Sequence, residues 1–297
     1  MSGHSAARAQ PANALAGVAV SSGMAEPVRT ASEHTPGEHA ASAPPAERTD
    51  RERRDERAAP TTPTAAARCL LDACRGGDTP AARSPEPHLA ALAAFDDDAL
   101  APVRTDRATA LAFWCNCYNA GTQRLLAERP ALYDSPLRSV RFFRAPAVTV
   151  GGTPLSLDTI EHGILRSRTK YGLGYLPRFL VGSFEHRYRL ADPDPRVHFA
   201  LNCGAASCPA IRAYDPANID AQLDLATRSY LDESVTYDPD AGTVELPQLF
   251  RWYRGDFGGP RGIRALLREY DVVPEGARPT LRYRSWDWSK APRKFVE

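Results

Sequence analysis

Arg196-Val-His-Phe-Ala-Leu-Asn-Cys-Gly-Ala-Ala-Ser-Cys-Pro209 is the stretch around which the rest of the sequence is organised. Every second residue from Val197 to Leu201 is large and apolar, a pattern that predicts a β-strand. The alternation ends at Gly204, and the small residues that follow predict a loop. Loops at strand ends often carry reactive side chains. The stretch therefore predicts a functional site, with Cys203 at the end of the strand.

The composition argues against several classes of protein. The 297 residues include 37 Lys and Arg against 36 Asp and Glu, so a net charge of +1 gives no bias toward nucleic acid. No run reaches the roughly 20 apolar residues that a membrane-spanning helix needs, and the weak apolar run at 12–20 is not rich in leucine, as a secretory signal usually is. Six cysteines without a CxxC pair do not form a disulfide scaffold. We expect a cytoplasmic protein that binds neither nucleic acid nor membranes.

The chain divides into a tail and one globular domain. Residues 1–64 are Ala, Pro, Ser, Glu and Arg with almost no large apolar side chains, which predicts a disordered tail. The mixed charges of Glu47–Arg57 are typical of a solvated linker. His4, His34 and His39 lie in this tail and are not considered as ligands. Residues 65–293 are expected to form a single domain.

The predicted elements alternate without regular βαβ units. Helices are expected at 65–74, 87–95, 106–129, 158–166, 218–231, 249–255 and 263–270, and hairpins at 148–155 and 235–246. This order favours an α+β fold, with several helices packed around a small, mainly antiparallel sheet.

Two predicted helices carry polar residues that could serve a site. Asn116 and Asn119 share one face of the helix at 106–129, where they either bond neighbouring backbone or line a site. Asp158 and Glu161 have the spacing of a capping box at the start of the next helix. His162 follows among apolar residues and is either structural or catalytic.

Four strings in the chain match a known family pattern. They are Phe113-Trp-Cys-Asn-Cys-Tyr-Asn-Ala120, Leu155-Ser-Leu-Asp-Thr-Ile-Glu-His162, His198-Phe-Ala-Leu-Asn-Cys-Gly-Ala-Ala-Ser-Cys-Pro209 and Trp252-Tyr-Arg-Gly-Asp-Phe257. Together they resemble the domain-of-unknown-function 547 family, over about residues 90–257. The resemblance implies no particular activity. It places Cys115 and Cys117 at variable positions that are usually apolar, which implies packing roles.

The leading hypothesis for the site is thiol chemistry. A cysteine hydrolase or acyl transferase needs a thiolate, a base within hydrogen-bond reach and an orienting group. Cys203 is the predicted nucleophile and Cys208 the alternate. On an extended strand His198 would lie about 16 Å from Cys203, so His162 is the predicted base.

The remaining groups of this hypothesis would support the base or the substrate. Asn116, Asn119 or Glu161 would orient the imidazole or bind an oxyanion. The substrate would be a small molecule or a peptide, with no cofactor and no metal.

Three alternatives remain open. His162, His198, Cys203 and Cys208 could bind zinc, although their spacing matches none of the usual finger patterns. The loop could instead be a structural or partner-binding element with inert, buried cysteines. A reversible Cys203–Cys208 disulfide is a further variant, which requires the loop to bring the two Cα atoms within about 4.4–6.8 Å.

Overall fold

A computed structural model describes residues 61–76, 84–167, 169–171, 176–177 and 181–296. The predicted tail therefore lies outside the described residues, apart from its last four. These residues begin the first described helix, because the Thr62 side chain accepts the Ala65 N–H and caps α2 (Pro63–Arg75). The helix thus starts two residues earlier than predicted.

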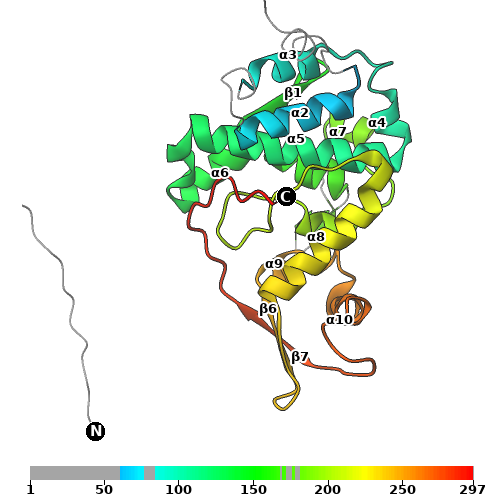
Figure 1. The fold of residues 1–297 in the computed structure, drawn as a ribbon, viewed down its shortest axis with the longest axis vertical. Helices are drawn as coiled ribbons and strands as arrows, with labels where there is room; N and C mark the ends of the chain where they lie inside the picture. The colour runs from blue at the N-terminus through cyan, green and yellow to red at the C-terminus, as the bar shows by residue number, and fades with distance from the viewer. Residues whose placement is uncertain (1–60, 77–83, 168, 172–175, 178–180, 297) are drawn as a thin grey trace, which may run out of the picture. The chain divides into compact units, whose positions relative to one another are not determined.

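The described chain mixes helices with short strands (Figure 1). After α2 come α3 (Glu86–Ala94), α4 (Ala101–Thr105), α5 (Arg107–Glu128), α6 (Pro136–Arg144), α7 (Ser183–Tyr188), α8 (Ile219–Ser234), α9 (Leu249–Trp252) and α10 (Gly259–Glu269). Shorter helical turns are η2 (Pro130–Tyr133), η3 (Thr159–Leu165), η4 (Pro195–Phe199) and η5 (Pro216–Asn218). The strands are β1 (Pro146–Val150), β2 (Thr153–Ser156), β3 (Thr169–Tyr171), β4 (Leu176–Pro177), β5 (Thr236–Asp238), β6 (Thr243–Pro247) and β7 (Thr280–Arg284).

Helix α5 is the centre of the larger core. Its N-cap is Asp106, whose carboxylate accepts the Thr109 N–H at 2.8 Å. The helix is buried on nearly every side from Ala110 to Leu126, as expected for a helix enclosed by other elements. It contacts α2, α4, β1, η3 and α8. The α+β class is confirmed, but the helices pack around α5 and not around a sheet.

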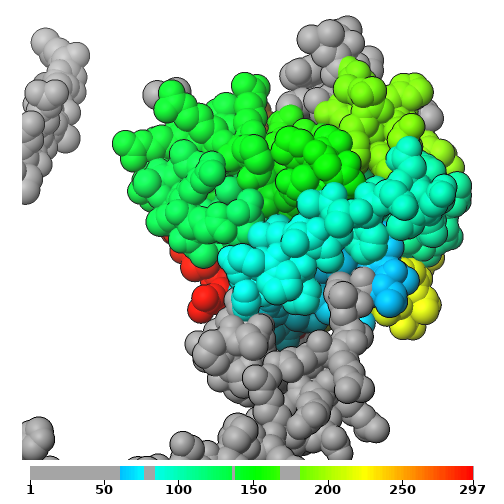
Figure 2. Space-filling model, turned by 90° about the horizontal axis from the view of Figure 1, so that it is seen from above, coloured from blue at the N-terminus to red at the C-terminus, as the bar shows by residue number. Residues whose placement is uncertain are grey.

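The sheets are small and separate (Figure 1). The predicted hairpin at 148–155 is confirmed as β1–β2, and both residues of its Gly151-Gly152 turn have positive φ angles, which glycine adopts without strain. The part of the chain that runs from α3 to this hairpin forms a continuous surface, coloured cyan to green in Figure 2. The second predicted hairpin is β5–β6, and β7 adds to it in parallel. This parallel pair, together with α6 and α7, was not predicted.

The predicted strand at 196–203 is wrong. Pro195–Phe199 forms the short helical turn η4, and the chain then continues as a loop. Pro195 fixes a helical φ at the first position, and the Asp194 carboxylate accepts the Arg196 N–H at 2.9 Å. Val197 and Phe199 are both buried, the first in the larger core and the second in a smaller core. Burial on two sides, and not a strand, explains the apolar alternation.

The smaller core joins the end of α8 to β6, α9 and α10. Its α10 packs directly on the segment that carries Asp256. A Cβ atom on Gly262 would lie 1.8 Å from the Phe257 carbonyl oxygen, so only glycine allows this approach. Within the described residues, none of the helices is both long and apolar enough to cross a membrane.

Candidate functional site

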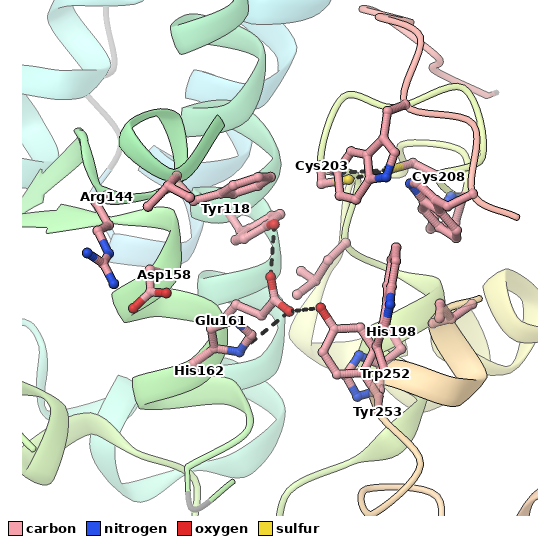
Figure 3. Close-up of a pocket in the computed structure, with 17 residues that line it drawn as sticks. Tyr118, Arg144, Asp158, Glu161, His162, His198, Cys203, Cys208, Trp252 and Tyr253 are labelled. Carbon is pink, nitrogen blue, oxygen red and sulfur yellow. Dashed lines mark hydrogen bonds and ion pairs between the residues drawn. The ribbon is translucent and has the colours of Figure 1, made fainter. Parts of the chain in front are cut away.

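A cavity of about 410 Å³ lies between α5, η3 and the loop that follows η4. Figure 3 shows Glu161 and His162 on one side of it and the two cysteines, Cys203 and Cys208, on the other. His198 also lines the cavity. Five of the seven residues proposed from the sequence therefore meet at one cavity.

Cys203 and Cys208 are in direct contact. Their Sγ atoms lie 2.7 Å apart, and the Cys203 N–H donates to the Cys208 sulfur at 3.1 Å. Asn202 closes the loop by donating to the Pro209 carbonyl at 2.7 Å while its own side-chain oxygen accepts the Gly204 N–H at 2.8 Å. The φ angle of Gly204 is 90°, a value that residues with a side chain adopt only with backbone strain. The loop therefore folds back on itself and brings the two thiols into contact.

The two thiols have opposite pKa shifts. Hydrogen bonding to Cys208 and burial raise the pKa of Cys203 well above its ordinary value. Burial also opposes ionisation of Cys208, but the donated thiol of Cys203, backbone N–H groups and the charge of Lys294 lower its pKa. These contacts favour a negative charge on Cys208 over one on Cys203. The sequence named Cys203 as the nucleophile and Cys208 as the alternate, and the choice between them stays a prediction.

Mild oxidation is expected to join this pair specifically. Treating the folded protein with hydrogen peroxide should remove two hydrogens from the peptide that holds Cys203 and Cys208, because the sulfur atoms are already in contact. Cys69 and Cys74, also free thiols, serve as the internal comparison. Peptide mass spectrometry before and after reduction measures the bond. Random pairing among the free cysteines would contradict the expectation.

Glu161 is a buried carboxylate held by two tyrosines. Tyr118 donates to it at 3.0 Å and Tyr253 at 2.6 Å (Figure 3). Burial favours a raised pKa for Glu161, but the nearby His162 and Arg166 side chains and the hydrogen bond from Tyr253 outweigh it, and the pKa is lowered. Glu161 is therefore ionised. The predicted capping box does not form, since the Thr159 N–H donates instead to Ser156 Oγ.

His162 is not placed to act as the predicted base. The Arg166 guanidinium approaches His162 Nδ1 at 2.6 Å. Because arginine has only donors, this nitrogen accepts, and in its neutral form the imidazole would carry its proton on Nε2. An imidazole in this state has no lone pair left to take a proton from a thiol. His162 is better described as part of the polar wall of the cavity.

A second network lies behind the cavity, centred on Asp256. Its carboxylate accepts Arg166 Nε at 2.5 Å, Arg166 Nη2 at 3.1 Å and His198 Nε2 at 2.9 Å. Burial opposes ionisation of Asp256, but these donors hold its pKa well below the ordinary value. Burial lowers the pKa of His198, whose ring stacks on Tyr253 at 4.0 Å between centroids. His198 is therefore neutral and donates its Nε2 proton to Asp256.

Asn116 and Asn119 do not line the cavity. The Asn116 side chain donates to the Tyr214 carbonyl and accepts the Tyr214 N–H. Asn119 likewise donates to Ala200 and accepts the Asn202 N–H. These contacts correct the predicted orienting role: both amides hold loops against α5. Asn119 positions the start of the cysteine loop.

The positions of Cys115 and Cys117 and of the possible metal donors bear on two further hypotheses. Cys115 and Cys117 are fully buried in α5, and burial raises the pKa of both thiols. They are packing residues, as the family resemblance implied. Within the described ranges, His, Cys, Asp and Glu residues do not gather in any group of three or more that could hold a metal ion. The zinc hypothesis therefore gains no support from the arrangement of the donors.

Several residues of the site were missed by sequence reasoning. Tyr118 and Tyr253 bind Glu161, Arg166 and Asp256 form the buried ion pair, and Trp286 lines the cavity. A signal was present for three of them, because Tyr118, Tyr253 and Asp256 lie inside strings that match the family pattern. Arg166 and Trp286 lie outside these strings.

The fold and the site define an α+β domain with a buried central helix and a thiol pair at the wall of a cavity. Residues 102–231 match the model of a family described as "Protein of unknown function, DUF547". The predicted resemblance is thereby confirmed. Comparison with curated proteins and with solved structures gave no match.

Proposed function

We propose that the domain is a cysteine-dependent hydrolase or acyl transferase in which Cys203 and Cys208 act as one unit. The observation that carries the proposal is the 2.7 Å contact between their sulfur atoms at the wall of the cavity. A buried thiolate that is stabilised by a neighbouring thiol is an activated nucleophile. The reducing cytoplasm expected from the sequence would keep both sulfurs in the thiol form.

The pair supplies both the nucleophile and the proton. The Cys208 thiolate attacks the carbonyl carbon of an acyl donor, a C–S bond forms, and the bond to the leaving group breaks. The leaving group takes the proton of the Cys203 thiol, whose raised pKa suits an acid that remains protonated until this step. Water then attacks the thioester and returns one proton to Cys203. In the transferase reaction an acceptor alcohol, amine or thiol replaces water.

The lining of the cavity favours an acyl donor with an apolar or aromatic group. Trp252 lies 5.3 Å from Trp286 and 5.6 Å from Trp288 between ring centroids, and all three line the cavity. Trp288 and Val140 are each 48% exposed at its lining, an unusual exposure for large apolar side chains. The substrate class is thus a small molecule or peptide whose acyl group can pack on these rings.

The test is acyl transfer from p-nitrophenyl esters of increasing acyl chain length. Wild-type protein should release nitrophenol and carry one acyl group, located by peptide mass spectrometry at Cys208. Alanine at Cys208 should reduce the rate by about 100-fold or more, and longer acyl chains should react faster. A Cys69→Ser variant is the matched control, since this thiol lies outside the cavity.

Two outcomes would contradict the proposal. Equal ester hydrolysis by wild type and the Cys208→Ala variant would remove the pair from the chemistry. A Cys208→Ala protein that merely unfolds at lower temperature, with no acyl adduct on wild type, would favour the structural alternative. An adduct on Cys203 would restore the nucleophile predicted from the sequence.

A further inference from the structure

A second concave site lies far along the chain from the thiol pair. A cavity of about 630 Å³ is lined by four arginines, Arg261, Arg264, Arg268 and Arg278. The first three lie on α10 at spacings of three and four residues, which places them on one face of the helix. Arg278 comes from the segment between α10 and β7 (Figure 1). Guanidinium groups from the helix and from the segment after it thus gather around one hollow.

These charges have no carboxylate partners among the described residues. None of the four arginines forms an ion pair there, and their hydrogen bonds go to backbone carbonyls. Arg264 donates to Pro279 at 2.9 Å and to Pro260 at 3.1 Å. Four positive charges that share a hollow without a counter-charge repel one another, and an anion would relieve this repulsion.

The site also holds an unused donor. Arg268 donates through Nη2 to the Ala277 carbonyl at 2.9 Å, which fixes the direction of its guanidinium group. Its Nε is buried and has no hydrogen-bond partner in the described structure. Buried donors are rarely left without an acceptor, so this nitrogen requires an explanation. A bound anion would supply the missing acceptor, and the surrounding positive charge favours an anion.

We propose that these four arginines bind a small ligand that carries phosphate groups. Guanidinium groups present paired donors that match phosphate oxygens, and two of the four are already held in place by the backbone. The site is separate from the thiol pair, and the proposal stands whether or not the domain is a thiol enzyme.

The surroundings favour a small ligand over a surface or a polymer. A membrane-binding face would place large apolar side chains beside the arginines, but the exposed ones in the described chain are Val140, Leu225 and Trp288, none of them on α10. A nucleic acid would track an extended basic stripe on a basic protein, whereas this chain has a net charge of +1. A compact hollow with four positive charges suits a phosphorylated small molecule.

Calorimetric titration of the full chain with inorganic pyrophosphate at low ionic strength tests the proposal. We expect one saturable site, and the double change Arg261→Gln with Arg278→Gln should weaken binding by about tenfold or more. These two side chains are exposed and make no hydrogen bond within the described residues, so the variant should keep the wild-type Tm. The exposed Arg138 on α6 gives the matched control, Arg138→Gln, which should bind as wild type.

The paired lysine variant, Arg261→Lys with Arg278→Lys, separates shape from charge. It should bind pyrophosphate more weakly than wild type and more tightly than the glutamine variant, because lysine keeps the positive charge but lacks the paired donors of a guanidinium group. Binding that is equal in wild type and the glutamine variant would overturn the proposal. So would binding to phosphatidylglycerol vesicles or to a single-stranded oligonucleotide without binding to pyrophosphate.

Discussion

Replacing Asp256 by asparagine is expected to destabilise the domain by about 3–5 kcal/mol, the usual cost of removing one partner from a buried ion pair. The Arg166 side chain is 2% exposed and Asp256 is 10% exposed, so a guanidinium that loses this carboxylate has almost no access to water. His198 would also lose the carboxylate that accepts its Nε2 proton. Urea unfolding, followed through tryptophan fluorescence, measures the change in the free energy of unfolding.

A surface ion pair of similar length provides the control. Arg187 and Asp97 lie 2.7 Å apart, but their side chains are 53% and 63% exposed. Asp97→Asn should therefore cost less than about 1 kcal/mol. Equal losses in the two variants would mean that burial does not govern the Asp256 pair, and the proposed role of this network would be wrong.

The cost of the Asp256 change should depend on pH. Because the folded pKa of Asp256 is depressed below the unfolded value of about 3.9, its contribution is fully present above that pH. The contribution is lost as the pH falls from there through the folded pKa. The difference between wild type and Asp256→Asn should therefore be constant from pH 5 to pH 7 and shrink below about pH 4.

The parts of the fold that were predicted correctly carry their signals locally. Asp106 caps α5 within three residues, and the Gly151-Gly152 pair dictates the turn between β1 and β2. The strand prediction for residues 196–203 is wrong because the apolar alternation reflects burial in two different cores. A helical turn can produce such an alternation as well as a strand can. Apolar spacing over a few residues cannot separate these two cases.

The site was predicted in its parts but not in its connections. Sequence reasoning selected Glu161, His162, His198 and both cysteines as candidates, and all five line the cavity. Their roles depend on contacts between distant residues. Asn119 and Asn202, which position the cysteine loop, are 83 residues apart, and Asp256 is 58 residues from His198. The incorrect strand prediction also affected His198. The distance of about 16 Å between His198 and Cys203 applies only if the five residues are extended, and they are not.

Changing Cys203 to alanine is expected to slow alkylation of Cys208 by iodoacetamide at pH 7 by about tenfold or more, whereas Cys203→Ser should not. Cys208 is fully buried, and burial alone would raise the pKa of its thiol. The hydrogen bond from Cys203 is the largest of the influences that oppose burial. Alanine removes this donor, so the pKa of Cys208 should rise and the fraction of thiolate at pH 7 should fall. Serine keeps an O–H group at the same position and should preserve the thiolate.

The comparison between these two variants isolates the hydrogen bond from the effect of access. In both proteins Cys208 is the sole remaining thiol of the pair, and alanine leaves more space around it than serine does. Better access would speed labelling in Cys203→Ala, which is opposite to the expected result. Peptide mass spectrometry across pH 5–10 gives the rate and the apparent pKa, with the partly exposed Cys69 as the internal reference. Equal rates in the two variants would show that Cys203 does not stabilise the Cys208 thiolate, and the two-thiol mechanism would lose its source of activation.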